Sequence, residues 1–283
     1  MPSSVVVFGG CGFIGSHVVE ELIMRNITVK GADIISSFPC DVRLPGHISI
    51  YITGDIDFIY NFAGVADIAT AISHPQETLE SHILGTLNIL EECRQQDIKR
   101  FVHASSVYVF SEYGSIYSVA KRASEDLIYE YHKLYGIPFT VLRYGSLYGP
   151  RAQPWNGVNR IVKQVMEGKV VFEGCPDEIR EFIHVRDAAR MSVDILHRSD
   201  CENKFLTLTG AEKLKWDDFI KMVFEIAGKE PQIKYKKMTR PHYKRTPYSF
   251  APKLGEKMIP SQYTDLGQGI MEMIYEHTDA DGG

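Results

Sequence analysis

The stretch Gly9-Gly10-Cys11-Gly12-Phe13-Ile14-Gly15 decides the fold, because glycines 9, 12 and 15 recur at every third position. The β-branched run Ser4–Phe8 precedes it and stops at the first glycines, as a buried parallel strand does. Apolar residues then recur at helical spacing over Ile14–Met24, and Thr28–Asp33 has the composition of a second strand. The stretch therefore predicts a strand, a tight turn and a helix.

Strand-like and helix-like segments alternate through the first half of the chain. Further strands are expected at Asp57–Phe62, Arg100–Ala104 and Phe139–Leu142, and helices at His82–Arg94 and Ser118–Tyr135. Such alternation is typical of an α/β fold. We predict a doubly wound parallel sheet of the Rossmann type.

One edge of this sheet is expected to be truncated and irregular. Only 23 residues separate Asp33 from Asp57, which is too few for a helix, a strand and a second helix. Ile48–Ile52 cannot be a parallel neighbour of Asp57–Phe62, because parallel neighbours need a crossover of about a dozen residues.

The composition of the chain changes after Pro150, where prolines, glycines and short expected elements dominate. We divide the chain into a nucleotide-binding unit, residues 1–150, and a smaller substrate lobe, residues 151–283. A segment near residues 183–200 is expected to pack back on the first unit, and the tail Thr278–Gly283 to be disordered. The helices expected in this part are Val158–Glu167, Val185–His197 and Trp216–Ala227.

Composition excludes several classes of protein. The 283 residues are 44% hydrophobic and 24% charged, which excludes a disordered chain, and the net charge of −5 argues against a nucleic-acid partner. No apolar stretch approaches the roughly 18 residues of a membrane span. The five cysteines form no CxxC pair and the histidines no HExxH. We therefore expect a cytoplasmic protein with reduced thiols and no metal.

The glycine stretch has the chemistry of a dinucleotide site. Gly9 permits the tight turn, Gly12 lets the backbone approach a pyrophosphate, and Gly15 lets helix and strand pack closely. The pyrophosphate would then lie at a helix N-terminus, which favours an anion. Asp33, 18 positions after Gly15, would bind the adenosine ribose and repel a 2′-phosphate, which favours NAD over NADP. The alternative is a glycine-rich turn without a ligand.

Tyr117 and Lys121 form a Y-x-x-x-K pair, which places both side chains on one face of a helix. A lysine ammonium near the phenol is expected to lower its pKa, so that the tyrosine can act as a general base or acid. Tyr129 and Lys133 have the same spacing. The two pairs differ in their position in the chain. Tyr117 comes shortly after Ser106, which lies at the carboxyl end of a predicted strand, where ligands bind in such sheets. We interpret Tyr129 and Lys133 as a solvated face.

An ordered set of motifs identifies a resemblance that covers most of the chain. The chain resembles the extended short-chain dehydrogenase/reductases, specifically the NAD-dependent nucleotide-sugar epimerase/dehydratase family and its UDP-hexose 4-epimerases. The motifs are GGCGFIGSH, NFAGVAD, HILGTLNILEECR, RFVHASSVYVF, YSVAK, LRYGSLYGPR, EGKVVFEGCPDEIREFIHVRDAA and TDLGQGIMEMI.

The resemblance implies a role for each matching residue. Ser106 would bond the sugar hydroxyl, Tyr117 would take its proton, and Lys121 would bind the nicotinamide ribose. The implied substrate-binding residues are Ser106, Tyr117, Ser146, Arg151 and Arg180, with Arg180 on the nucleotide diphosphate, and the segment Trp155–Asn159 is a candidate for facing the base. The implied NAD-binding residues are Gly9, Gly12, Phe13, Ile14, Gly15, Asp33, Asp41, Phe62, Ala63, Gly64, Tyr117, Lys121 and Tyr144. For the contact near the adenine, Asp41 is preferred to Asp55, which precedes a strand.

The sequence also departs from the family pattern. Phe110 and Ser111 replace a Tyr-Gly pair, and Ser146 and His82 each stand where the family has asparagine. The segment between Ser106 and Tyr117 is shorter than in a typical member. The loop over the sugar is therefore expected to be cut back, and the substrate specificity to be unusual.

The residues beside Ser106 narrow the reaction. A 4,6-dehydratase of the family uses a Thr-Asp-Glu run, and a 3,5-epimerase/reductase uses a cysteine; this chain has Ser106-Val107-Tyr108. Reversible C4 oxidation and reduction, a 4-epimerase reaction, is the leading hypothesis, with a role in carbohydrate biosynthesis. The alternatives are a nucleotide-sugar 4-dehydrogenase or 4-ketoreductase, a dehydratase-like member, and a non-catalytic cofactor-binding member. The family's four-helix interface also implies a homodimer through His82–Arg94 and the helix that carries Tyr117.

Overall fold

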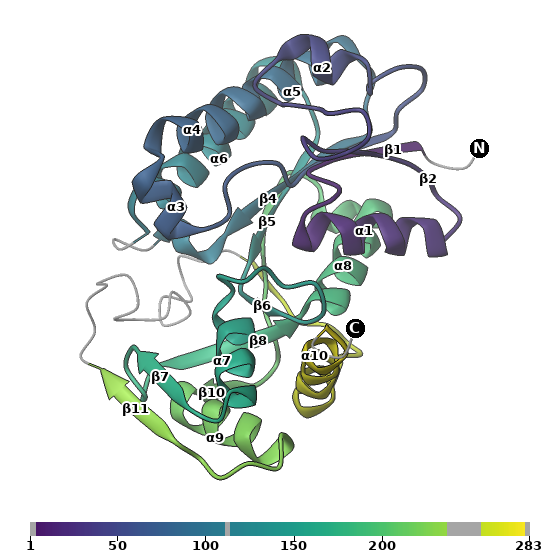
Figure 1. The fold of residues 1–283 in the computed structure, drawn as a ribbon. Coiled ribbons are helices and arrows are strands. Elements are labelled where there is room, and N and C mark those ends of the chain that lie inside the picture. Colours follow the sequence, from purple (N-terminus) through teal and green to yellow (C-terminus); the bar gives the residue numbers. More distant parts are fainter. Residues whose placement is uncertain (1–3, 111–113, 237–255, 281–283) are drawn as a thin grey trace.

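The computed structural model describes residues 4–110, 114–236 and 256–280. Its frame is a seven-stranded, wholly parallel sheet with the order β12-β9-β5-β4-β3-β1-β2 (Figure 1). The strands are β1 (Ser4–Phe8), β2 (Thr28–Ala32), β3 (Phe58–Asn61), β4 (Arg100–Ser106), β5 (Phe139–Tyr144), β9 (Lys204–Leu208) and β12 (Glu256–Met258). This order confirms the predicted doubly wound fold.

Helices cover both faces of the sheet. Successive side chains of β1 point to opposite faces of the sheet. Val5 and Val7 therefore join one core cluster, and Val6 and Phe8 join another. The first cluster lies under α1 (Phe13–Met24) and α8 (Val185–Asp194). The second lies under α2 (Pro45–Ser49), α5 (Gly85–Gln95) and α6 (Ser115–Tyr135). Short helices α3 (Ile68–Ser73) and α4 (Pro75–Leu79) and the π-helical turn Glu80–Leu84 lead into α5.

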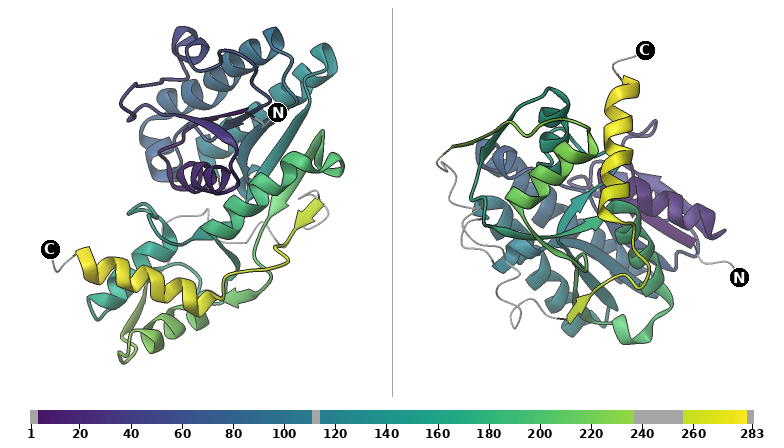
Figure 2. Two further views of the ribbon diagram at one scale, coloured as in Figure 1. Left: turned by 90° about the vertical axis from the view of Figure 1, so that its right-hand side faces the viewer. Right: turned by 90° about the horizontal axis from the view of Figure 1, so that it is seen from below.

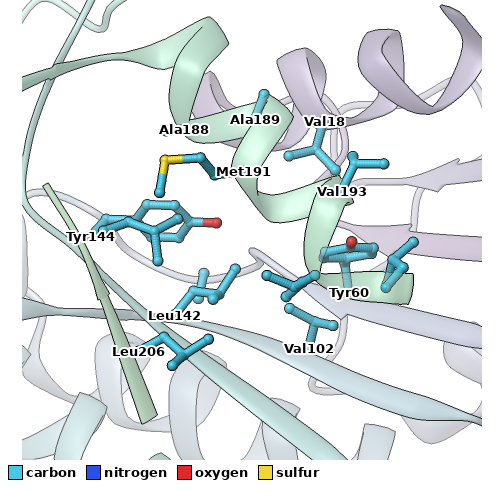
Figure 3. Close-up of a cluster of buried hydrophobic side chains, with 14 of the residues drawn as sticks. Val18, Tyr60, Val102, Leu142, Tyr144, Ala188, Ala189, Met191, Val193 and Leu206 are labelled. Atoms are coloured by element: carbon cyan, nitrogen blue, oxygen red, sulfur yellow. The ribbon is translucent and has the colours of Figure 1, made fainter. Parts of the chain in front are cut away.

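Helix α8 is fastened to the sheet by two buried tyrosines. The Tyr60 hydroxyl donates to the carbonyl oxygen of Ser192 at 2.6 Å, and the Tyr144 hydroxyl lies 2.7 Å from the Ser192 hydroxyl. Figure 3 shows the apolar side chains of α8 facing those of the sheet across this contact. The segment expected to pack back on the first unit does so through α8.

A buried ion pair fastens α6 to the opposite face. Glu125 accepts hydrogen bonds from Arg143 on β5 at 2.9 and 2.6 Å and from the Ser105 hydroxyl on β4 at 2.5 Å. One turn earlier, the Lys121 ammonium donates to the carbonyl oxygen of Ala104 at 2.6 Å. These contacts fix the helix that carries Tyr117 over the ends of β4 and β5.

Figure 2 shows the helices and short strands of the smaller lobe. They pack around a third core cluster. The strands of the lobe form two small sheets, β10-β8-β6 and β11-β7, beside α7 (Gly157–Met166), α9 (Trp216–Ile226) and α10 (Leu266–Ala280). The strands are β6 (Ser146–Tyr148), β7 (Val170–Glu173), β8 (Ile179–His184), β10 (Lys213–Lys215) and β11 (Ile233–Lys236).

The predicted truncation of the sheet edge is confirmed. Strand β2 lies at this edge of the sheet, and the segment that follows it in the chain forms the short helix α2. Ile48 and Ile52 are buried in the second core cluster, so the segment covers the sheet without extending it.

The division of the chain at residue 150 remains a proposal, and strands β9 and β12, which lie beyond that residue, belong to the large sheet. One expectation about the second half needs correction. The tail was expected to be disordered from Thr278, but α10 continues to Ala280 because Ile270 and Met273 anchor it in the third cluster. Residues 281–283 lie outside the described residues.

Gly15→Ala is expected to destabilise the protein by at least about 1–3 kcal/mol and to prevent NAD retention, because the new Cβ would overlap the carbonyl oxygen of Gly9. Chemical denaturation and the NAD content of the purified protein measure both effects. Gly46→Ala is the matched control, since nothing lies near its Cβ position. Equal stability and NAD content in both variants would contradict the expectation.

Candidate active site

A cavity of about 350 Å³ opens between the large sheet and the smaller lobe. Its walls are formed at the carboxyl ends of β1, β3, β4 and β5, by α6, and by β6, β8 and the starts of α7 and α9 from the lobe. This is the edge of a doubly wound sheet at which ligands bind. Of the predicted residues, the cavity brings together Gly9, Gly12, Phe13, Ile14, Gly15, Phe62, Gly64, Ser106, Tyr117, Lys121, Tyr144, Ser146 and Arg180.

The glycine stretch forms a cradle that a pyrophosphate fits. Gly9 has φ +78°, which only glycine adopts freely, and a Cβ there would lie 2.6 Å from the backbone nitrogen of Ala63. Gly12 precedes α1 without a side-chain cap, and no acidic residue occupies the first turn of that helix. The helix start therefore presents backbone N–H groups and a positive dipole end to the cavity.

The two predicted adenosine-side carboxylates lie outside the cavity lining. Asp33 follows β2 and accepts a hydrogen bond from the Cys11 N–H at 3.0 Å, so it adjoins the glycine turn. Asp41 lies near it, because the Cys40 N–H donates to the Asp33 carbonyl at 2.8 Å. Arg43 engages the Asp41 carboxylate and holds its pKa below the usual range. Asp55 is exposed ahead of β3, at the amino end of the sheet. Contacts of either predicted carboxylate with NAD remain predictions.

Ser106 and Tyr117 meet at the cavity wall. Ser106 ends β4, its hydroxyl accepts a hydrogen bond from the Tyr108 N–H at 3.2 Å, and it hydrogen-bonds the Tyr117 phenol. Tyr117 lies on α6, one turn before Lys121. The tyrosine is half-buried and the lysine is buried. Residues 111–113 lie outside the described residues, so the predicted replacement at Ser111 has no structural account.

The expected lowering of the Tyr117 pKa is not found in the protein alone. Burial raises the pKa of the phenol to about 12, and the hydrogen bond with Ser106 offsets this only in part. The Lys121 ammonium donates to the carbonyl of Ala104 and lies 5.8 Å from the centre of the tyrosine ring. Burial lowers the pKa of Lys121 to about 8. The lysine is therefore held near the phenol without setting its pKa in this state.

His82 lies in the wall behind Tyr117. Its Nε2 is 2.9 Å from the carbonyl oxygen of Val65, and its ring meets the Tyr117 ring edge to face at 5.9 Å. Burial lowers the pKa of His82 to about 3, so the ring is neutral. A side chain at Gly64 would overlap this ring. Histidine thus fills a place where the family pattern has asparagine.

The lobe forms the wall of the cavity that faces the large sheet. Ser146 on β6 and Arg180 on β8 line it, as do Trp155 and Asn156 from the segment that was a candidate for facing the base. Arg151 does not line the cavity. Its guanidinium pairs with Glu20 at 2.5 Å, which directs it away, so its predicted substrate role has no counterpart in this geometry.

Sequence reasoning missed two aromatic residues that the lobe adds to the wall, Phe182 and Trp216. Phe182 could have been found, because it stands two residues after Arg180 on one strand and so shares its face. Trp216 begins α9 and packs on Phe182 at a ring distance of 5.3 Å, a contact that no local pattern encodes. Asp67 also lines the cavity, but its carboxylate accepts the Thr70 N–H and caps α3.

Comparison with known proteins assigns this architecture. Residues 5–205 match the model of the NAD dependent epimerase/dehydratase family. The chain belongs to this family. It is therefore an NAD-dependent enzyme, and the cradle at Gly9, Gly12 and Gly15 fits the cofactor.

Individual relatives agree with the assignment to the epimerase/dehydratase family. An uncharacterised UDP-glucose epimerase of Bacillus subtilis is 24% identical over 266 residues, which cover 82% of this chain and 84% of the relative. The UDP-glucuronic acid 4-epimerase of Bacillus cereus, solved with UDP-glucuronic acid and NAD, is 26% identical with a TM-score of 0.81, covering 98% of this chain and 99% of that one. The UDP-glucose 4-epimerase of Thermotoga maritima has a TM-score of 0.83 at 22% identity, with the same coverage. Its likeness shows the fold alone.

No helix among the described residues of this family member is long and apolar enough to cross a membrane. All five cysteines are free thiols.

Tyr117→Phe is expected to lower turnover by about 10²–10⁴-fold while leaving NAD bound, because it removes only the proton-transferring hydroxyl. Product formation and the NAD content of the purified variant measure the two effects. Tyr129→Phe is the matched control, since Tyr129 has a lysine at the same spacing, 5.2 Å from its ring centre, but is 46% exposed. Unchanged turnover in Tyr117→Phe would refute the assigned role.

Proposed function

We propose that the enzyme epimerises a nucleotide-activated sugar at C4 through a 4-keto intermediate. The observation that carries this proposal is the group Ser106, Tyr117 and Lys121 at one cavity wall, where no neighbouring carboxylate among the described residues lines the cavity. Among the described lining residues the one acidic side chain is Asp67, which caps a helix. Such a wall can move one proton at a secondary hydroxyl.

Each residue of the group has a defined task in this proposal. Ser106 hydrogen-bonds the C4 hydroxyl, and Tyr117 takes its proton and later returns it. Lys121, a buried cation held by Ala104, places positive charge beside the phenol and the nicotinamide ribose. When bound, NAD would supply reversible acceptance and return of a hydride at C4, on opposite faces of the sugar, so that the net reaction would consume no cofactor.

The alternatives differ in what the site would need. A 4,6-dehydratase needs an acid and a base for elimination, whereas Val107 and Tyr108 follow Ser106 here. A 4-dehydrogenase or 4-ketoreductase would use the same group but stop after one hydride transfer. A non-catalytic member would have no need for the three residues together. The relatives named above carry UDP-glucose and UDP-glucuronic acid in their names, which favours a UDP-sugar among possible substrates.

A product screen tests the proposal. Purified protein without added cofactor is mixed with UDP-, dTDP-, GDP- and CDP-hexoses, and the anomeric protons are followed by NMR. We expect a new C4-epimer signal with at least one sugar nucleotide, because retained NAD is regenerated in each cycle. Product that forms only with stoichiometric NAD or NADH would favour the dehydrogenase or reductase. Absence of product with and without added cofactor would favour a non-catalytic, cofactor-binding protein.

We also infer a cytoplasmic homodimer formed by α5 and α6. Leu90 on α5 is buried in the protein's own core, but Leu84 and Val119 are exposed on the neighbouring outer surface. A partner that covers them would remove apolar surface from water.

Light scattering is expected to give twice the mass of the chain. Val119→Glu should shift the protein toward the monomer, because it would bury a charge at the interface. Ile23→Glu on α1, a more exposed apolar position on the other face of the sheet, is the control. A monomeric wild-type protein would contradict the inference.

A further inference from the structure

A buried carboxylate stands directly behind the cation that faces the substrate side of the cavity. The Glu178 Oε1 lies 2.9 Å from the Arg180 Nη2, and both side chains are only 4% exposed. Arg180 lines the cavity, whereas Glu178 does not. The two residues are separated by one position at the start of β8, so they share a face. The carbonyl of Glu178 accepts the Trp216 N–H at 3.1 Å, which holds the strand start against α9.

The ion pair is the main polar contact of this carboxylate. Apart from the arginine, neither carboxylate oxygen of Glu178 finds a hydrogen-bond donor among the described residues. Charged groups on the adjacent elements are engaged elsewhere. On β10, Lys215 pairs with Asp177 at 2.9 Å, and Lys213 lies 3.8 Å from Glu181. On α9, Asp217 pairs with Lys221 at 2.7 Å and faces Tyr235. Asp218 on the same helix faces Lys215 and Lys221.

Burial and the arginine act on this group in opposite directions. Burial raises the pKa of the Glu178 carboxyl to about 7, and the charge of Arg180 limits the rise. Near neutral pH the carboxyl group is therefore poised between its charged and neutral forms. A change in the surroundings of Arg180 will move this balance.

We infer that Glu178 couples binding of the substrate's diphosphate to uptake of a proton, because the diphosphate and the carboxylate compete for Arg180. The inference rests on the proposed function, in which a nucleotide sugar occupies the cavity. Phosphate oxygens drawn to the guanidinium share its charge and bring negative charge close to Glu178. A carboxylate left buried beside an anion is costly, so Glu178 binds a proton and becomes neutral.

The sign of the pH dependence follows from this coupling. Below neutral pH Glu178 is already protonated, so it no longer competes with the diphosphate for the charge of Arg180. Above neutral pH each binding event must take a proton from solution. The dissociation constant then rises with pH, by at most about tenfold per pH unit for one proton. Glu178 would thus tune nucleotide-sugar affinity to pH near neutrality without touching the sugar.

Titration calorimetry of the NAD-loaded protein tests the coupling with UDP-glucose and dTDP-glucose as probes. Their diphosphates are diesters and lack the second phosphate ionisation, whose pKa is about 6, so the probes themselves do not titrate. In wild-type protein at about pH 8 we expect uptake of close to one proton, measured from the dependence of binding heat on the buffer. Affinity should fall as the pH rises from about 6 to 9.

Glu178→Gln keeps the shape of the side chain and removes its titration. We expect this variant to bind without that proton uptake, and about tenfold more tightly than wild type at pH 8, with the two converging near pH 6. Glu181→Gln is the matched control: Glu181 is the next acid on β8, equally buried, but it pairs with Lys257 at 2.7 Å and does not line the cavity. The control should keep the wild-type pH dependence.

The outcomes separate the inference from the proposed function. Binding by wild type without proton uptake, or the same pH dependence in Glu178→Gln, overturns the coupling and leaves the proposed function intact. Failure of the wild-type protein to bind either probe at pH 6 overturns both. If the glutamine variant does not fold, binding by the wild-type protein without proton uptake still overturns the coupling.

Discussion

The buried ion pair between Glu125 and Arg143 is the contact on which the geometry of the site depends. Each partner is almost fully enclosed, and Ser105 adds a third hydrogen bond to the carboxylate. Breaking such a pair from one side leaves an unpaired buried charge, which costs about 3–5 kcal/mol. Because the pair joins α6 to β4 and β5, it sets the height at which Tyr117 meets Ser106. The hydroxyls of Ser106 and Tyr117 are thus aligned by a contact two helical turns away from Tyr117.

The cavity is bordered by two buried cations with different restraints. Lys121 donates its hydrogen bond to a neutral carbonyl oxygen, that of Ala104, and not to a carboxylate. Arg180 is held by a carboxylate, so its charge is shared before a ligand arrives. The cofactor side of the site is thus preorganised, whereas the substrate side carries an internal competitor. Burial acts on all these groups in the same way, by penalising whichever form is charged.

Much of the framework could be predicted from sequence because its signals are local. The glycines of the first turn, the period of two in β1 and the helical spacing of α6 each follow from neighbouring residues. Residues of the site that lie on those elements, such as Gly9 and Tyr117, were therefore predicted. Trp216 was missed, since it reaches the wall by packing on Phe182 of another element.

The sequence by itself determined the parallel sheet, its truncated edge, the glycine cradle and the tyrosine–lysine pair. The tertiary structure decided that β9 and β12 return to the sheet, and that Glu20 draws Arg151 away from the cavity. It also decided that Glu178 backs Arg180 in a buried pair. The physical reason is that residue periodicity states which face of an element is buried, while the distant segment that buries it is selected only when the whole chain packs.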